Sequence, residues 1–480
     1  MTFTTLTFLI FFVAVFALYW SLRSLRAQNI LLVIASYVFY GWWDWRFCLL
    51  MVAASLVDFS VGLGLNKAEV PWKRKFLLTC GLTCNLSMLG FFKYFNFFAE
   101  NFQIAAAQIG WQMDPFILNV VLPVGISFYT FQTMSYSIDI YRRKLRGTTQ
   151  LLEYLAYVSF FPQLVAGPIE RATHLLPQFF KERLFSEAQA TDGCKQILWG
   201  LFKKMVIADN LAPIVEAAFS NPSAYNGAEL ALATIFFAFQ IYCDFSAYSD
   251  IAIGVAKLLG FELMRNFAYP YFSQSVGEFW RRWHISLSTW FKDYVYFPLG
   301  GNRVGQSRLI FNVMVTFLLS GLWHGASWNF LIWGALNGLG VLPEILRPRH
   351  SKRNSSEIPV SQPSVGACFK ILATFTFICV GWVFFRAQTF AGALLVLERI
   401  GTSFLSSAGG LLARHDPTDG RIFIVLPLLV GLEWVKRRYP HPLVFERWPR
   451  FARGIAYAAL FWTIVYLGTY GSSTFIYFQF

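Results

Sequence analysis

The chain has 480 residues, of which 56% are hydrophobic, 19% are aromatic and 14% are charged, and its formal net charge is +14 at pH 7. A soluble domain carries roughly 25% charged residues, so this composition excludes a soluble globular protein and predicts a polytopic membrane protein. The positive charge does not indicate a nucleic-acid binder. Lys and Arg stand in short clusters between apolar runs, as they do in cytoplasmic loops.

The first segment, Met1–Trp20, is apolar but differs from a cleaved signal peptide. It has no basic region before it and no small-residue cleavage site, and Arg23 and Arg26 follow it directly. These features predict a retained first span with its N-terminus outside the cytoplasm.

About a dozen apolar runs are candidates for crossing or entering a bilayer, which takes roughly 20 residues per full span. They are Thr5–Trp20, Ile30–Tyr40, Phe47–Leu63, Phe76–Phe98, Pro115–Met134, Leu151–Val165, Leu198–Ala218, Leu230–Leu259, Leu309–Leu322, Asn329–Leu342, Phe369–Phe385, Ile422–Val435 and Ile455–Leu467. The shortest runs are also compatible with tilted or re-entrant segments.

The basic clusters between these runs give a consistent topology when all of them are cytoplasmic. The segment Glu100–Asp114 then faces outward, and it contains no Lys or Arg. The last span ends outside. Arg347–Pro363, rich in Ser, Pro, Lys and Arg, is expected to be a flexible cytoplasmic loop. Because no internal repeat is present, we expect a single membrane domain over residues 1–480.

Two stretches show the spacing of an amphipathic helix. In Gly277–Phe297, apolar residues recur at helical intervals and His284 lies at the edge of the apolar stripe. Such a helix lies along the interface or lines a funnel. The second stretch, Gln196–Asn210, carries Lys203 and Lys204 inside an apolar run.

Two histidines stand in aromatic sequence at membrane depth. His324 lies between Trp323 and Gly325, and His284 follows Trp283. A structural hydrogen bond would explain either residue. The alternative is chemistry, because burial of an ionisable group within a membrane must be compensated and a neutral imidazole can act as a general base.

Asp244 and Asp250 stand among apolar neighbours, where a carboxylate is costly unless it is paired. They predict either a proton or ion relay, or helix packing in which each carboxylate is held by an Arg or a helix N-terminus. The seven cysteines show no metal-ligand spacing, and we expect neither a disulfide framework nor a metal site. No Gly-x-x-x-x-Gly-Lys-Ser/Thr or Gly-x-Ser-x-Gly motif occurs.

Several motifs together resemble those of membrane-bound O-acyltransferases. They are Trp323-His324-Gly325, Arg281–Ser286 (Arg-Arg-Trp-His-Ile-Ser) and Tyr242–Ser246 (Tyr-Cys-Asp-Phe-Ser). Four more resemble the bacterial alginate O-acetyltransferase branch of that family. These are Leu122–Phe131, Phe161–Glu170, Phe297–Arg303 and Phe475–Phe480.

The resemblance implies a ring of about 11–13 tilted transmembrane or re-entrant helices around a thin central funnel. It implies acyl transfer from acetyl-CoA, a cytoplasmic donor substrate, to a hydroxyl outside, with no bound cofactor. The catalytic histidine of the family carries over to His324, and the second motif histidine to His284. Trp323 and Asn329 are expected to hold His324, and Asp244 and Asp250 are further supporting candidates. Lys203, Lys204, Arg281, Arg282 and Arg303 are candidates for a basic mouth that receives the donor's phosphates.

The resemblance also implies a multi-pass protein of the bacterial inner membrane with both termini periplasmic. It implies a periplasmic partner transferase and a polysaccharide biosynthesis or export complex. The acceptor could instead be peptidoglycan, cellulose or a teichoic acid. From another class, a proton-coupled transporter and a non-catalytic scaffold remain alternatives.

The topology places His324 at or just below an outward hairpin between Leu309–Leu322 and Asn329–Leu342. Both apolar runs are about 14 residues long, which predicts that the bilayer or the helices thin around the site.

Overall fold

The computed structural model describes residues 1–114, 117–118, 120–346, 364–407, 419–445, 448–471 and 475–476. Within these ranges the regular structure is entirely helical, which confirms the all-α prediction. The chain divides into two compact units, Met1–Cys194 with Ala252–Met264, and Lys195–Ile251 with Arg265–Phe480. A single domain over residues 1–480 stays a prediction, and the predicted flexible loop 347–363 lies outside the described residues.

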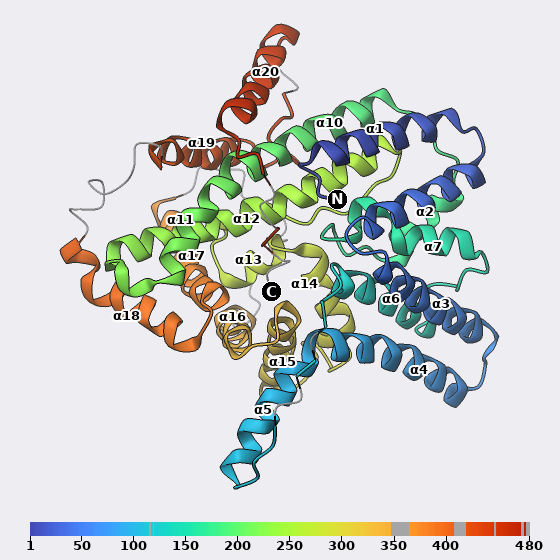
Figure 1. Ribbon diagram of the computed structural model, residues 1–480, viewed down its shortest axis with the longest axis horizontal. Coiled ribbons are helices and arrows are strands. Elements are labelled where there is room, and N and C mark those ends of the chain that lie inside the picture. The colour runs from blue at the N-terminus through green and yellow to red at the C-terminus, as the bar shows by residue number, and fades with distance from the viewer. Residues whose placement is uncertain are drawn as a thin grey trace. The chain divides into compact units, whose positions relative to one another are not determined.

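The first unit contains the amino-terminal helices (Figure 1). They are α1 Leu6–Ser21, α2 Leu25–Gly41, α3 Arg46–Lys67, α4 Pro71–Leu89, a π-helix at Gly90–Tyr94, α5 Phe95–Gln108, α6 Ile126–Tyr141, α7 Leu151–Ser159, α8 Phe161–Leu164, α9 Ala172–Leu175, a 3-10 turn at Leu176–Phe180, and the start of α10 Glu187–Leu201. The buried carboxylate of Asp58 on α3 joins three helices, because it accepts hydrogen bonds from Asn85 on α4 at 2.7 Å and from Ser137 on α6 at 2.6 Å.

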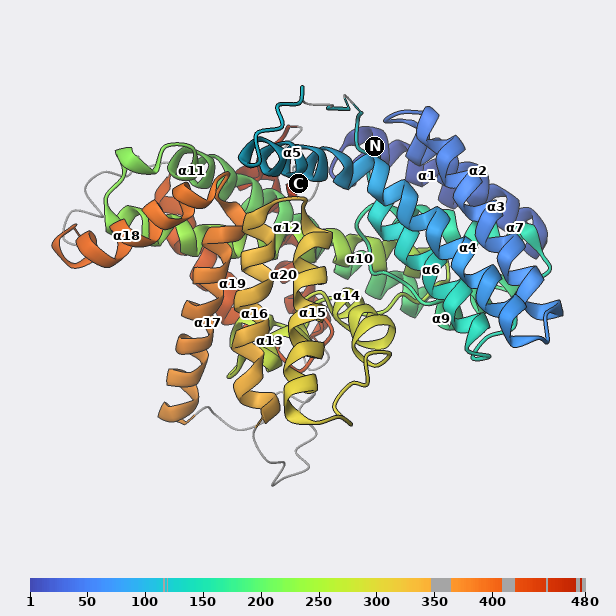
Figure 2. The same ribbon diagram turned by 90° about the horizontal axis from the view of Figure 1, so that it is seen from below.

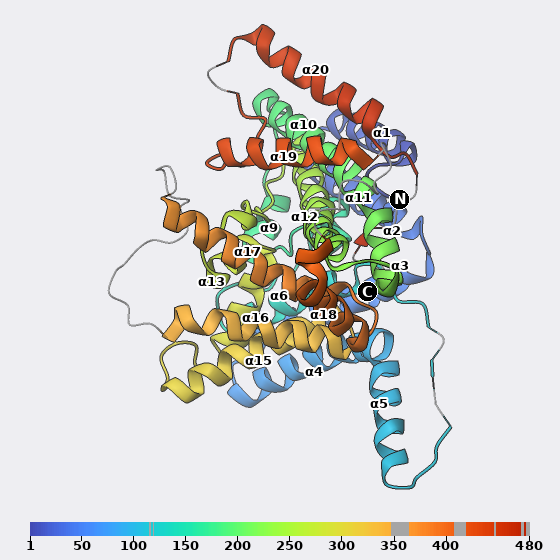
Figure 3. The same cartoon turned by 90° about the vertical axis from the view of Figure 1, so that its left-hand side faces the viewer.

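The second unit contains most of the remaining helices. They are the end of α10, a π-helix at Phe202–Ala208, α11 Asp209–Ser220, a 3-10 turn at Pro222–Ala224, α12 Gly227–Leu258 as far as Ile251, a 3-10 turn at Pro270–Phe272, α13 Val276–Arg282, α14 Ile285–Phe291, a π-helix at Lys292–Tyr296, α15 Gln306–His324, α16 Trp328–Leu346, α17 Val365–Arg386, α18 Phe390–Ser407, a 3-10 turn at Asp419–Arg421, α19 Ile422–Val435 and α20 Arg450–Leu467. Helices α15, α16 and α17 lie side by side in one row (Figure 2 and Figure 3).

The pair α15 and α16 packs at unusually short range because glycines face each other. A Cβ atom at Gly321 of α15 would overlap the backbone oxygen of Phe330, and one at Gly334 of α16 would overlap that of Phe317. Small residues let helix backbones approach closely. The sequence therefore fixes the hairpin that carries His324.

Five helical segments of the described chain are long and apolar enough to cross a membrane. They are Arg46–Lys67, Pro71–Gln108, Gly227–Leu258, Trp328–Leu346 and Val365–Arg386, and the shorter apolar helices Leu6–Ser21 and Ile422–Val435 accompany them. The prediction of a multi-pass membrane protein is therefore confirmed.

Two predicted spans are longer than the observed helices. The helix expected from Pro115 begins only at Ile126, after Gly125 adopts a left-handed backbone with φ of 76°. The run Leu151–Val165 is broken at Phe160, between α7 and α8. In both places the apolar run is longer than the helix. The residues around Phe160 continue into a buried turn, whereas Ile117, Val120 and Val121 lie in an exposed segment before α6.

Helices α15 and α16 are longer than the apolar runs from which they were predicted. Each has 19 residues, which corresponds to about 28 Å at 1.5 Å per residue. That length approaches the ~30 Å of a hydrocarbon core. The short apolar runs therefore gave the wrong helix length, because Gln306, Ser307 and Arg308 extend α15 and Pro343–Leu346 extends α16 beyond them. Helix length alone gives no reason for local thinning.

Candidate active site

His324 is the last residue of α15 and is 3% exposed. Its ring is enclosed by aromatic rings, with centroids 4.9 Å from Trp323 and 4.9 Å from Trp333. Phe385, at the end of α17, lies 5.4 Å away. A Cβ atom on Gly325 would overlap the ring of Phe330. The Trp-His-Gly sequence therefore suits a chain that must turn tightly after the histidine.

His284 lies at a break in the predicted amphipathic helix. Its backbone is left-handed, with φ of 43° and ψ of 55°, and it separates α13 from α14. The prediction of one continuous helix over Gly277–Phe297 is wrong for this reason. A left-handed conformation costs a non-glycine residue about 1–2 kcal/mol, so surrounding contacts must hold the turn in place.

Asn266 supplies those contacts. Its backbone oxygen accepts a hydrogen bond from Ile285 N at 2.9 Å, and its side-chain oxygen accepts from Ser286 N at 3.2 Å and Ser286 Oγ at 3.0 Å. Its Nδ2 donates to Ser249 Oγ on α12 at 3.1 Å. Asn266 is completely buried, and the sequence analysis did not single it out. The Arg-Arg-Trp-His-Ile-Ser motif is thus tied to α12 through one asparagine.

The two histidines belong to one cluster. Their ring centroids are 6.4 Å apart, and Trp323 lies 5.9 Å from His284 while also contacting His324. Phe245 of α12 packs edge-on against His284 at 4.6 Å. The structure therefore brings together His284, His324 and Trp323, three of the residues selected from the sequence.

Protonation of the buried His284 ring is strongly disfavoured. The residue is on the turn between α13 and α14, outside the five candidate spans, and burial lowers its pKa to about 3. The cause is desolvation, which penalises the charged imidazole. His284 is therefore neutral at physiological pH and can offer one donor and one acceptor nitrogen.

A layer of tryptophans connects this cluster to the neighbouring helices. Trp283 lies 5.1 Å from Trp382 of α17, and Trp382 stacks on Trp333 of α16 at 6.0 Å. Trp280 donates from Nε1 to Asn337 Oδ1 at 3.1 Å. These contacts fix α13 against α16 and α17 behind the histidines.

Asn329 lies near the start of α16 and is 5% exposed. Its Nδ2 donates to the backbone oxygen of Ala387 at 2.8 Å, so it joins the start of α16 to the end of α17. Its expected role beside His324 stays a prediction.

Asp244 and Asp250 are both held by lysines of the π-helix Phe202–Ala208. Lys204 Nζ lies 2.7 Å from Asp244 and 2.8 Å from Asp209, while Lys203 Nζ lies 2.6 Å from Asp250. Asp244 also accepts from Ile476 N at 2.7 Å, and Asp250 from Gln196 at 2.8 Å. Asp244 is buried and Asp250 is half-buried, and both carboxylates are compensated by these pairs. A supporting role in chemistry stays a prediction.

The other basic candidates for a donor mouth also have acidic neighbours. Arg281 pairs with Glu344 at 2.8 Å, and Arg282 with Glu278 at 2.5 Å. Lys203 is 2% exposed, so it is a poor candidate for a mouth open to solvent. Arg303 is exposed. Among the described residues, no group of three or more His, Cys, Asp or Glu side chains is arranged to hold a metal ion.

Comparison with known proteins identifies the family of proteins to which this chain belongs. Residues 135–385 match the family model of the membrane-bound O-acyltransferases. The chain belongs to the membrane-bound O-acyltransferase family. That stretch contains both histidines, Asn266 and the lysine–aspartate pairs.

Several relatives align over most of this acyltransferase. It is 40% identical over 400 residues to a protein described as probable alginate O-acetylase AlgI from Pseudomonas aeruginosa, covering 83% of this chain and 74% of that one. It is 35% identical over 393 residues to a peptidoglycan O-acetyltransferase of Helicobacter pylori, with 76% and 72% covered. A teichoic acid D-alanyltransferase of Bacillus subtilis is 25% identical over 287 residues, with 57% and 70% covered. The protein is a membrane O-acyltransferase of the branch that includes the alginate O-acetylases.

Proposed function

We propose that the protein moves an acetyl group from cytoplasmic acetyl-CoA across the bacterial inner membrane for O-acetylation of an exported polysaccharide such as alginate. The observation that carries the proposal is the buried cluster in which His324 and His284 lie 6.4 Å apart. The 40% identity to a protein described as an alginate O-acetylase supports the acetyl group and the polysaccharide.

His324 acts as the general base in this proposal. It accepts the proton of the attacking hydroxyl, the hydroxyl oxygen bonds to the thioester carbonyl carbon, and the C–S bond breaks. The CoA thiolate then takes the proton back from His324, which leaves an ester and free CoA. A positioned histidine contributes about 10²–10⁴-fold to such a step.

His284 orients the acceptor or donates to the developing oxyanion. Its neutral ring provides an N–H donor without a charge that would have to be desolvated, and oxyanion stabilisation of this kind is a large term in acyl transfer. The rigid turn held by Asn266 supports this role, because it fixes the ring before the substrate arrives.

The proposed topology has both termini in the periplasm and the basic clusters in the cytoplasm. His324 then lies at the outward end of the α15–α16 hairpin. A periplasmic partner transferase, associated with the polysaccharide biosynthesis or export complex, provides the acceptor hydroxyl and then passes the acetyl group from that ester to a hydroxyl of the polymer, which restores its own hydroxyl. No cofactor is bound, and acetyl-CoA is a substrate.

A second acceptor has a specific observation in its favour. The relative from Helicobacter pylori is described as a peptidoglycan O-acetyltransferase and is 35% identical. Peptidoglycan is therefore the alternative acceptor, reached by the same chemistry. A proton-coupled transporter is less well supported, because Lys203 and Lys204 neutralise the two carboxylates on which a relay would depend.

The test replaces His324 by Ala and measures two quantities, acetate esters on the isolated polymer and CoA released from acetyl-CoA by membranes. Both should fall by at least 10². His174→Ala is the matched control, because it removes a half-exposed imidazole from the other unit and should leave both quantities unchanged. Normal ester content with a His324→Ala protein present at equal abundance would refute the proposal.

The acceptor is decided by a separate measurement. Acetate esters are quantified on both the exported polysaccharide and the peptidoglycan of cells with and without the gene. Loss from the polysaccharide alone is the expected result, and loss from peptidoglycan alone would assign the alternative.

A further inference from the structure

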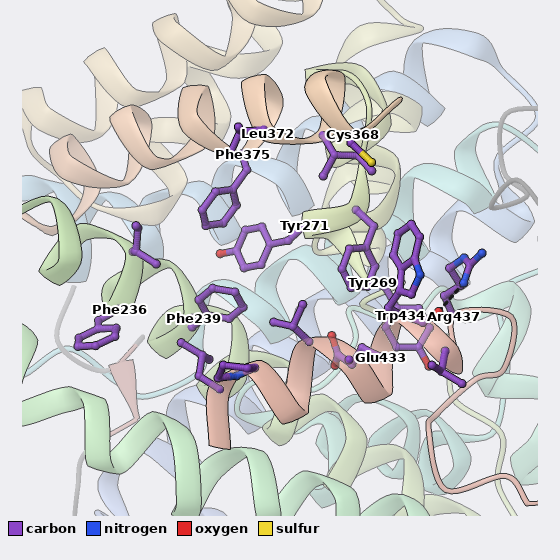
Figure 4. Close-up of a pocket in the computed structure, with 18 of the residues that line it drawn as sticks. Phe236, Phe239, Tyr269, Tyr271, Cys368, Leu372, Phe375, Glu433, Trp434 and Arg437 are labelled. Carbon is purple, nitrogen blue, oxygen red and sulfur yellow. Dashed lines mark hydrogen bonds between the residues drawn. The ribbon is translucent and has the colours of Figure 1, made fainter. Parts of the chain in front are cut away.

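A cavity of about 1290 Å³ lies in the second unit between α12, α17 and α19. Its walls are mainly aromatic and aliphatic, with Phe236 and Phe239 from α12, Leu372 and Phe375 from α17, and Phe423 and Trp434 from α19 (Figure 4). Neither His284 nor His324 lines this cavity. It is therefore a separate feature of the fold.

An aromatic layer separates the cavity from the histidine cluster. Tyr271, which lines the cavity, lies 6.1 Å from Trp283, the residue before His284. Tyr271 is fixed because its hydroxyl donates to the backbone oxygen of Ala238 at 2.5 Å. The wall formed by Tyr271 is thus held in place between the cavity and Trp283.

The outer walls indicate what fills it. Leu372 is 61% exposed on α17, a candidate membrane span, and Phe423 is 37% exposed on α19. Apolar surface of this kind faces hydrocarbon in a membrane protein, and water in such a groove would gain few hydrogen bonds. The occupant is therefore an acyl chain.

The length of α19 is also sufficient for a lipid chain. Helix α19 has 14 residues, which corresponds to about 21 Å at 1.5 Å per residue. One leaflet accounts for about half of a ~30 Å hydrocarbon core. A single phospholipid tail can therefore run along α19 within one leaflet.

The polar end of the groove selects the headgroup. Three consecutive basic residues, Lys436, Arg437 and Arg438, follow α19 directly. Arg437 lines the groove, stacks over the Trp434 ring at 4.3 Å and donates to the Trp434 backbone oxygen at 2.6 Å. The acidic group at this end, Glu433, accepts the Tyr242 hydroxyl at 2.8 and 3.0 Å. A basic cluster at a membrane surface attracts anionic lipid headgroups.

We propose that this groove binds one anionic phospholipid, with an acyl chain between α12, α17 and α19 and its phosphate against Arg437. Arginine suits this contact because its planar guanidinium can donate two parallel hydrogen bonds to phosphate. The site is independent of the acyl-transfer chemistry and would bind lipid in a protein whose His324 is replaced.

The test uses the full-length protein in vesicles of equal phosphatidylglycerol and phosphatidylethanolamine, followed by native mass spectrometry of the extracted protein. One phosphatidylglycerol should remain bound, in at least fivefold preference over phosphatidylethanolamine. Arg437→Gln should remove that preference. Arg450→Gln is the matched control, since Arg450 is an exposed arginine at the start of α20 that does not line the groove, and it should retain the preference.

A second pair of variants tests the chain rather than the headgroup. Gly431 lines the groove and a Cβ atom there meets nothing within 4 Å, so Gly431→Trp can fill the groove without a backbone clash. It should lose bound lipid of both kinds, whereas Gly454→Trp, on α20 with equally open surroundings, should not. Equal retention of the two lipids by the unaltered protein, detergent as the sole adduct, or unchanged phosphatidylglycerol in Arg437→Gln would overturn the proposal.

Discussion

The imidazole rings of His284 and His324 lie 6.4 Å apart, and the indole of Trp323 contacts both of them. The two histidines come from different structural settings, a left-handed turn and the end of the 19-residue helix α15. Burial in one aromatic cluster keeps water away from both rings, which strengthens electrostatic interactions inside the site. An arrangement of this kind suits two groups that act on the same reacting centre.

Single and double replacement of the histidines tests that joint action. His324→Ala and His284→Ala should each lower the rate of CoA release by about 10²–10⁴-fold. The double variant should be at most a few fold slower than His324→Ala, because the effects of replacing residues that act as a unit are not additive. Initial rates in membranes with equal protein content measure this. If the rate loss in the double variant equals the product of the two single losses, the histidines act independently.

The sequence predicted the parts of the site that have a local signal. Aromatic flanks identified His284 and His324, and apolar runs located the α15–α16 hairpin. The pairing of Lys203 with Asp250 had no such signal, since it depends on how the π-helix Phe202–Ala208 packs against α12. Asn266 was missed for the same reason: it stands in a loop without periodicity, and only the fold brings Ser286 to it.

Replacement of Asn266 should lower activity through His284. Asn266→Ala removes side-chain hydrogen bonds to Ser286 and Ser249 and leaves buried polar groups unsatisfied, which costs about 1–3 kcal/mol. We expect a lower kcat because the His284 turn loses its support. Asn312→Ala is the control: this completely buried asparagine donates to Gly301 O. It should lower thermal stability by a similar amount and leave kcat unchanged. Equal kcat losses in both variants would assign Asn266 a purely structural role.

The ion pair between Lys203 and Asp250 should be structural. Lys203→Met removes the cation beside the half-buried Asp250 carboxylate, and Asp250→Asn leaves the buried Lys203 ammonium without its counter-charge, which costs about 3–5 kcal/mol. Lys203→Met combined with Asp250→Asn removes both charges and should recover most of the lost stability and activity. Thermal unfolding in detergent and CoA release measure the two quantities.

An exposed ion pair provides the comparison for that experiment. Arg281 and Glu344 are 41% and 36% exposed, and exposed pairs contribute about 0–1 kcal/mol, so Arg281→Gln should shift the unfolding temperature little. A Lys203/Asp250 double variant that is stable but inactive would instead favour a proton relay through these residues.

The close packing of α15 on α16 should make Gly321 intolerant of a side chain. Gly321→Ala places a methyl group on the backbone oxygen of Phe330, and overpacking of this kind costs about 1–3 kcal/mol. Activity should fall further than stability, because the hairpin carries His324. Gly454→Ala, where a Cβ meets nothing within 4 Å, should be neutral or stabilise α20 by about 0.5–1 kcal/mol. Normal activity in Gly321→Ala would show that the site does not depend on the close packing of α15 on α16.

The hydrogen bond between His174 and Glu170 predicts a pH dependence of stability in the first unit. His174 Nδ1 lies 2.7 Å from Glu170 Oε2, and this bond raises the pKa of His174 above its ordinary value of 6.5. The second carboxylate oxygen accepts from Met264 N at 2.5 Å, so Glu170 is anchored on both sides. A raised pKa means that the folded state binds the proton more tightly than the unfolded state does.

The charged His174 ring therefore stabilises the folded state fully below pH 6.5, and this contribution to the free energy of unfolding is lost as the pH rises through the raised pKa of His174. His174→Gln should unfold at a lower temperature than the unaltered protein at about pH 5.5, and the difference should shrink towards about pH 8. Thermal unfolding in detergent across this range measures it. The effect should be small, because the His174 side chain is 47% exposed to solvent and exposed pairs are screened. A difference that grows with pH would mean that Glu170 favours the neutral imidazole, contrary to the geometry of the hydrogen bond.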